Sequence, residues 1–438
     1  MVASGLAGES LRLRMARGIG WNLVGTATLQ GSTFIVNIAV ANLLGRRVFG
    51  EYAIVQSTVA LFVSVVQWAA GYTATKYLAE FRSIDPARAG RLLGMLAVLS
   101  GFLGAVLALL LLVSANGLAV HVLANPELST ALMIASGAVF LGVGNVFLIG
   151  SLAGLESYPA FGRAGLIGGT CTVIACVFGA RTGGLAGAVV GLVVGGMIQS
   201  VALVKSVANE TARHGIAVDF AGIGSELNLL VRYSLPVALS GLVTLPAIWA
   251  GNTLLARQPG GYDAMAVFAA ANSFRIMVIF LPSIVNSVSL SLLNNQRGLG
   301  NERRFRRIFW FNVGAAGSIA AAAAAAASFA GPFLLKIFGH DFVGGYPVLL
   351  VLMAATVPES LANAMLQLVH SREQSWRALR GVTIPGFGTL VVIAWWATPA
   401  AGASGLAWAY LAASGVLLVG TSVIVSRLGI RSGAVPAG

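Results

Sequence analysis

Long apolar runs constrain this chain more than any other feature. Of its 438 residues, 57% are hydrophobic and only 9% are charged, whereas roughly a quarter of the residues of a soluble domain are charged. A helical run of about 20 apolar residues crosses a hydrocarbon core about 30 Å thick. The sequence therefore predicts an all-α, multi-pass membrane protein.

Twelve runs of suitable length are bounded by charged or turn residues. We expect each of them to form one transmembrane helix. The runs comprise residues 19–44, 52–75, 92–113, 130–152, 164–180, 185–204, 233–256, 264–292, 308–330, 346–369, 381–398 and 405–426.

The distribution of basic residues predicts the orientation. With the N-terminus inside, 21 of the 27 Lys and Arg residues lie in cytoplasmic segments, five lie outside and Arg275 lies within the membrane. The positive-inside rule therefore places both termini in the cytoplasm. Cytoplasmic basic residues beside anionic lipid headgroups account for the net charge of +13, so no nucleic-acid partner is needed.

The longest predicted loop, residues 206–231, divides the spans six and six. We expect an N-terminal six-helix lobe over residues 1–205, a cytoplasmic linker over 206–231 and a C-terminal six-helix lobe over 232–438. The last spans of the two halves open on similar sequences, GGLAGAVVGLVVG and ASGLAWAYLAASG. Such echoes are typical of an internally duplicated transporter, and they predict a central cleft between two bundles.

Signatures of catalysis and metal binding are absent from the sequence. It has no Walker motif, no G-x-S-x-G elbow and no metal-type spacing of His or Cys. The only cysteines, Cys171 and Cys176, fall in one apolar run, where we expect buried small residues. We therefore predict that the chain is not an enzyme and uses neither a metal ion nor a cofactor.

Polar residues form stripes on several predicted spans. On the eighth span, Asn272, Arg275, Ser283 and Asn286 share one helical face, because each residue turns the helix by about 100°. The first and second spans carry similar stripes. These stripes either join neighbouring helices or line a water-filled cleft. As candidate substrate-binding residues we select Arg275, Asn272, Asn286, Asn22, Asn37, Gln56 and Gln67.

Arg275 is the most informative member of these stripes. A charged side chain at the bilayer centre costs at least about 2.5 kcal/mol, so it must face water, an acid or an anionic ligand. Glu359 in the tenth span is the deepest acid in the sequence. Arg275 therefore either forms a structural pair with Glu359 or supplies positive charge to a cleft for an anionic substrate. Glu359 is also a candidate for proton or sodium coupling.

Several segments resemble those of the bacterial polysaccharide and oligosaccharide flippases, within the multidrug, oligosaccharidyl-lipid and polysaccharide exporter superfamily. The resemblance spans nearly the whole chain and is carried by NLLGRRVFGEYAI, GSLAGLESYPAF, YSLPVALSGLV, AVFAAANSF and LLKIFGHDFVGGYPVL. It implies transfer of polyprenyl-pyrophosphate-linked sugar units to the outer leaflet of the bacterial plasma membrane. It also implies a cavity lined by spans one, two, seven and eight, with cationic residues facing the pyrophosphate.

The flippase interpretation assigns further roles. Arg17, Lys76 and Arg232 would draw the headgroup to the cytoplasmic mouth, while membrane lipid surrounds the polyprenyl tail. Glycosyltransferases and a polysaccharide polymerase would be partners. Arg46 and Arg47 lie on the predicted outer side, either in a solvated turn or at the outer mouth.

Two alternatives remain open. A cation-coupled multidrug or small-molecule exporter of the same superfamily is disfavoured because the first and seventh spans contain no acid. A membrane polymerase is disfavoured because no long outer loop is present to hold reactive groups.

Overall fold

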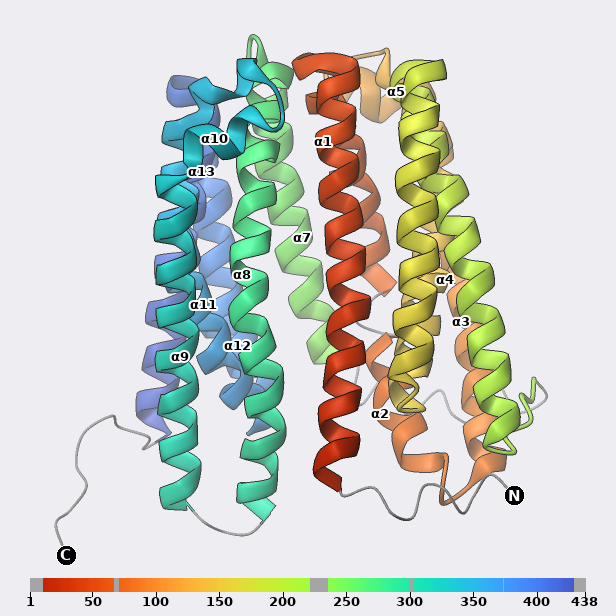
Figure 1. Cartoon of the computed structure of the whole chain (residues 1–438). Helices are drawn as coiled ribbons and strands as arrows, with labels where there is room; N and C mark the ends of the chain where they lie inside the picture. The colour runs from red at the N-terminus through yellow and green to blue at the C-terminus, as the bar shows by residue number, and fades with distance from the viewer. Residues whose placement is uncertain (1–10, 67–70, 221–234, 299–301, 373, 429–438) are drawn as a thin grey trace, which may run out of the picture. The chain divides into compact units, whose positions relative to one another are not determined.

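A computed structural model describes residues 11–66, 71–220, 235–298, 302–372 and 374–428. Every regular element in these ranges is helical (Figure 1). The long helices are α1 (Leu11–Val66), α3 (Pro86–Gly117), α4 (Leu128–Gly154), α5 (Tyr158–Arg213), α7 (Leu235–Ala256), α8 (Gly261–Gly298), α9 (Glu302–Phe329), α11 (Tyr346–Ser371) and α13 (Ile384–Arg427). The short ones are α2 (Tyr72–Phe81), η2 (Leu118–Val122), α10 (Gly331–Lys336), η5 (His340–Gly345), α12 (Ser375–Ala378) and η6 (Leu379–Thr383).

The predicted fold class, an all-helical membrane protein, is confirmed. In the described part of the chain, eight helices are long and apolar enough to cross a membrane, and the shorter α7 is also apolar. The predicted runs fall on helices, except that the run at 52–75 includes residues 67–70 and the run at 233–256 begins with residues 233 and 234, which lie outside the described ranges. The count of twelve spans and the cytoplasmic position of both termini stay predictions.

Three of the long helices each include residues of two predicted spans, and in each of them a glycine breaks the helical backbone between the two spans. The breaks lie at Gly45 in α1 (φ 83°, ψ 173°), Gly184 in α5 (φ 58°, ψ −136°) and Gly402 in α13 (φ 55°, ψ −129°). Positive φ is a conformation that residues with a Cβ adopt only at a cost. Each glycine therefore marks a point where the chain turns from one predicted span into the next.

The breaks in α5 and α13 have the same arrangement of glycines around the turn. Three residues after each turn glycine, Gly187 and Gly405 face the backbone carbonyls of Gly179 and Ala397, where a Cβ has no room. Both hairpins thus bring backbone against backbone through a small residue. The same local geometry near the end of each half supports the predicted internal duplication.

The chain forms two compact units. Unit 1 contains residues 1–36, 62–115 and 130–238, and unit 2 contains residues 37–61, 116–129 and 239–438. Parts of the first half of the sequence, 37–61 and 116–129, thus belong to the unit built mainly by the second half. The predicted lobe boundaries stay predictions, but α5 continues as a helix to Arg213 and therefore runs past residue 205 into the predicted linker.

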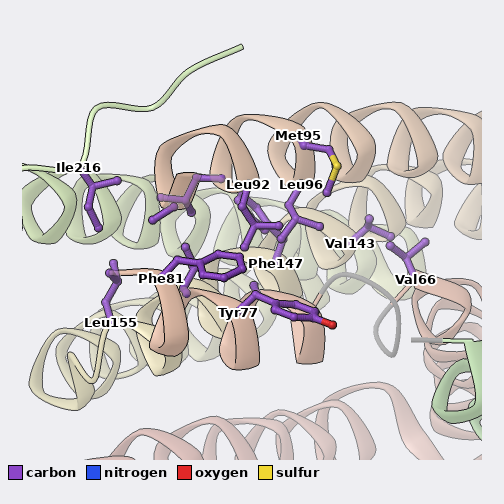
Figure 2. Close-up of a cluster of buried hydrophobic side chains, with 14 residues drawn as sticks. Val66, Tyr77, Phe81, Leu92, Met95, Leu96, Val143, Phe147, Leu155 and Ile216 are labelled. Carbon is purple, nitrogen blue, oxygen red and sulfur yellow. The ribbon is translucent and has the colours of Figure 1, made fainter. Parts of the chain in front are cut away.

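Unit 1 contains an apolar cluster that joins α2, α3 and α4 (Figure 2). On α2, Tyr77 and Leu78 lie four and three residues before Phe81, so both are about one helical turn from it and all three contribute to the same buried face. Leu92 of α3 and Phe147 of α4 pack against that face. Since lipid is as apolar as these side chains, close packing and not transfer from water stabilises such helix contacts within a bilayer.

Unit 2 is organised around α11, which contacts α8, α9 and α13. The cluster at one end of these helices includes Phe305 and Phe309 of α9, Leu368 and Val369 of α11 and Val425 of α13. This arrangement places one face of α8 against α11, and that face carries the candidate site.

Candidate functional site

Arg275 lies on the buried face of α8 in unit 2. Its side chain is 9% exposed, and its Nε–H donates a hydrogen bond to Asn272 Oδ1 at 2.8 Å. The two residues are three apart and therefore share one face of the helix. The predicted stripe on the eighth span thus joins its own members through a hydrogen bond.

Glu359 of α11 pairs with Arg275. Arg275 Nη1 donates a hydrogen bond to Glu359 Oε2, and the two groups form a salt bridge. The sequence left open whether Arg275 has this acidic partner, and the structure confirms the pair. The Glu359 side chain is 23% exposed, more than that of Arg275. The carboxylate is therefore the more accessible half of the pair.

Tyr410 of α13 completes the surroundings of the guanidinium. The Cζ atom of Arg275, at the centre of the guanidinium, lies 4.8 Å from the centroid of the Tyr410 ring, within the range of a cation–π interaction. Phe268, two turns before Arg275 on α8, contacts Tyr410, with its ring centroid 5.4 Å from that of the tyrosine. Sequence analysis missed Tyr410, although it is the only tyrosine of the last predicted span, residues 405–426.

The three partners of Arg275 differ in what they can do. Asn272 and Tyr410 are neutral and hold the guanidinium in position, whereas Glu359 neutralises its charge. A guanidinium offers five N–H donors in a planar fork that matches carboxylate and phosphate oxygens equally well. The site can therefore hold a carboxylate, as here, or exchange it for an anionic ligand.

The structure also describes the side chains of Asn37, Asn286 and Gln56. Asn37 Nδ2 donates a hydrogen bond to Ser273 Oγ on α8 at 3.3 Å. Asn286 is 2% exposed, and its Oδ1 accepts a hydrogen bond from Asn312 Nδ2 of α9 at 3.0 Å. Gln56 is half-buried in α1. Asn37 therefore contacts the helix that carries Arg275, while Asn286 links two helices of unit 2.

The predicted cytoplasmic mouth is only partly described. Lys76 is exposed on α2, with its ammonium 5.0 Å from the centroid of the Tyr77 ring. Gln67 and Arg232 lie outside the described residues, as do the side chains of Arg17 and Asn22. Their predicted roles stay predictions.

At one end of unit 2, Arg46 joins three segments of the chain. Its Nε–H donates to the backbone carbonyl of Asp263 at 3.1 Å, and Nη1 donates to the carbonyl of Asp341 at 3.2 Å. Phe49 packs against both Phe338 and Phe342, with its ring centroid 5.7 and 6.0 Å from theirs. The arginine that sequence analysis placed in a solvated turn or at the outer mouth therefore holds the turn after Gly45 against α8 and η5.

Two further hydrogen bonds join α7 to α1 within unit 2. Trp249 Nε1 donates to Thr58 Oγ1 at 3.0 Å, and Asn252 Nδ2 donates to Ser57 Oγ at 2.9 Å. Sequence analysis selected none of these four residues. Their spacing shows no helical period that would have marked them in the sequence.

The helices described above define this protein as an all-helical, multi-pass membrane protein. No protein-family model matches the sequence, and no curated protein matches it. Among solved structures, it is similar to an inward-facing multidrug resistance MATE family transporter of the MOP superfamily, with 17% identity, a TM-score of 0.74 and coverage of 94% of this chain and 100% of the other.

Two further structures share the fold. The eukaryotic MATE transporter AtDTX14 has 15% identity and a TM-score of 0.75, with coverage of 94% of this chain and 96% of its own. The lipid II flippase MurJ, in an inward closed conformation, has 13% identity and a TM-score of 0.75, with coverage of 92% and 87%. The fold is thus shared by MATE transporters and by a lipid II flippase.

Proposed function

We propose that this chain is a flippase of the bacterial plasma membrane that moves polyprenyl-pyrophosphate-linked oligosaccharides to the outer leaflet for surface polysaccharide biosynthesis. The observation that carries the proposal is the arginine buried on α8. A cation within a membrane-spanning helix suits an anionic cargo. The shared fold with a lipid II flippase supports the same class of cargo.

The Arg275–Glu359 pair gives this proposal a specific mechanism. In the absence of cargo, the carboxylate neutralises the guanidinium, which removes the cost of an isolated charge in the membrane. An arriving pyrophosphate takes the place of the carboxylate and makes two parallel hydrogen bonds to the guanidinium. Asn272 and Tyr410 hold the guanidinium in place during this exchange.

Release of Glu359 from Arg275 also changes the charge balance at the carboxylate. The freed carboxylate must take up a proton or a cation, because an unpaired charge in this environment is costly. Cargo binding is thereby coupled to ion binding at Glu359. Alternation of the protein between inward-open and outward-open states then completes the transfer.

The second candidate function is a cation-coupled exporter of drugs or other small molecules. Glu359 favours it, because an embedded and partly exposed acid is a natural site for a coupling ion. Two of the three similar structures above are MATE transporters. The absence of an acid from residues 19–44 and 233–256 argues against it.

Reconstitution into liposomes separates these two functions. Purified protein is incorporated with a polyprenyl-pyrophosphate-linked oligosaccharide, and transfer is followed by cleavage of the sugar with a glycosidase added outside. We expect transfer by the wild type, strong loss in Arg275→Ala, and partial activity in Arg275→Lys, which keeps the charge but loses the planar fork.

The matched control is Arg181→Ala, which removes an exposed arginine of α5 and should leave transfer unchanged. Transfer at the wild-type rate by Arg275→Ala would refute the proposed role of the arginine. No lipid transfer by the wild type, together with proton- or sodium-driven efflux of a cationic dye, would favour the exporter.

A further inference from the structure

Unit 1 contains a second cluster of charged residues, separate in sequence from the Arg275 site. A cavity of about 480 Å³ opens where α2 ends, where α4 meets α5, and where α5 ends. Its lining includes three arginines and a histidine but only two acids: Arg82, Arg163, Arg213, His214, Glu156 and Glu210. The motif GSLAGLESYPAF, which the proposed function leaves without a role, supplies part of this wall.

Two of the arginines are held by carboxylates. Arg82 Nη2 lies 2.6 Å from Glu156 Oε1, and Arg213 Nη1 lies 2.7 Å from Glu210 Oε1. The Glu210 side chain is 11% exposed and that of Arg82 is 19% exposed. These pairs therefore position cationic groups at the cavity before any ligand arrives.

Arg163 completes the cationic lining in a different way. Its Nε–H donates to the carbonyl of Pro159 at 3.3 Å, and no carboxylate lies among its contacts with the described residues. The side chain is exposed at the cavity. The charge of Arg163 is thus the one that the acids of the cavity do not balance.

Glu156 is held in an unusual backbone conformation. Its φ is +55°, a left-handed value that costs a residue with a Cβ about 1–2 kcal/mol. Glu156 stands just after the end of α4, at a position where helices usually have glycine. The next residue, Ser157, donates its backbone N–H to the carbonyl of Leu152 at 2.9 Å. Such local strain is concentrated at functional sites. A carboxylate at this position, where glycine fits better, keeps Arg82 engaged.

Buried side chains next to the charged ones make the cavity rigid. Phe81, which precedes Arg82, and Leu155, which precedes Glu156, belong to the apolar cluster of unit 1. Ile216, which follows the end of α5, belongs to the same cluster (Figure 2). The backbone on three sides of the cavity is therefore fixed by one packed core, which limits the cost of binding to side-chain rearrangement.

We infer that this cavity is a binding site for a phosphate-bearing anion, with Arg163 as the principal contact and Arg82 as a second contact released from Glu156. Guanidinium groups bind phosphate oxygens through charge-assisted hydrogen bonds. All of these residues lie at the end of unit 1 that the positive-inside rule assigns to the cytoplasm. The phosphate belongs either to an anionic lipid headgroup or to a soluble phosphate compound. This site is independent of transfer through Arg275.

Binding measurements on the full-length protein test the inference. Inorganic pyrophosphate is titrated calorimetrically into protein in a neutral detergent, and phosphatidylglycerol is compared with phosphatidylcholine by native mass spectrometry of protein released from nanodiscs. A soluble ligand gives a calorimetric signal that depends on Arg163, whereas a lipid site gives retained phosphatidylglycerol without pyrophosphate binding that depends on Arg163. Either result, if it depends on Arg163, supports the site.

Three variants are expected to weaken, strengthen and leave unchanged the binding of the probe. Arg163→Ala should weaken binding about tenfold, because a hydrogen bond to a charged group is lost. Glu156→Gly should strengthen it, since it frees Arg82 and also suits the left-handed backbone. Arg377→Ala, an exposed arginine of unit 2, is the control and should bind like the wild type. Binding of neither probe, or binding that Arg163→Ala and Glu156→Gly leave unchanged, would overturn the inference.

Discussion

Replacing the Arg275–Glu359 pair by apolar residues distinguishes a structural role from a transport role. Arg275→Met keeps an unbranched side chain of similar reach, and Glu359→Leu keeps a similar volume. Removing one partner of a buried pair costs about 3–5 kcal/mol, because an uncompensated charge remains, whereas replacing both partners together is close to neutral. The two single variants and the double variant therefore form a cycle with a clear expected order.

The exposure of the two side chains predicts which single variant is less stable. Glu359→Leu leaves a guanidinium that is 9% exposed and that stays protonated at all accessible pH values, so its cost is at the upper end, about 5 kcal/mol. Arg275→Met leaves a carboxylate that is 23% exposed and that can bind a proton, so its cost is nearer to about 3 kcal/mol.

Thermal unfolding in nanodiscs and transfer of lipid-linked oligosaccharide are the two assays. We expect the unfolding temperature to fall most in Glu359→Leu, less in Arg275→Met and little in the double variant. All three should lose transfer. A double variant that is stable and transfers lipid at the wild-type rate would show that the pair is structural only. Single variants as stable as the wild type would refute the energetic argument itself.

The remaining predictions concern the backbone breaks and the junction at Arg46. Gly402→Ala should lower the unfolding temperature, because an alanine with positive φ costs about 1–2 kcal/mol. Its control, Gly388→Ala, lies at an open helical position and should be neutral or slightly stabilising. Equal effects of the two substitutions would contradict the role of the break. Arg46→Ala removes hydrogen bonds to two backbone carbonyls and should destabilise the protein by about 1–3 kcal/mol, measured by thermal unfolding; an unchanged unfolding temperature would contradict it. Gly50→Ala should be more damaging in the same assay, because the added Cβ meets the carbonyl of Tyr262, and a tolerated alanine would show that this approach is not tight.

The amino-acid sequence by itself determined the properties that depend on local pattern. The length of the apolar runs predicts membrane-spanning helices, which the structure contains, because a helix rises a constant distance per residue. The helical period places Asn272 and Arg275 on one face, and they form a hydrogen bond. The cost of a charge in lipid required Arg275 to have a partner, although the sequence left its identity open.

Only the tertiary structure decided which groups meet across helices. Glu359 lies 84 residues from Arg275, and Tyr410 lies on yet another helix. Asn286, selected from the same stripe as Arg275, bonds to Asn312 of α9. The helical period predicts the face on which a side chain lies, but the neighbour of that face depends on how separate helices pack. That packing is set by close contacts of small and branched side chains over the whole unit, and no single segment of the sequence contains this information.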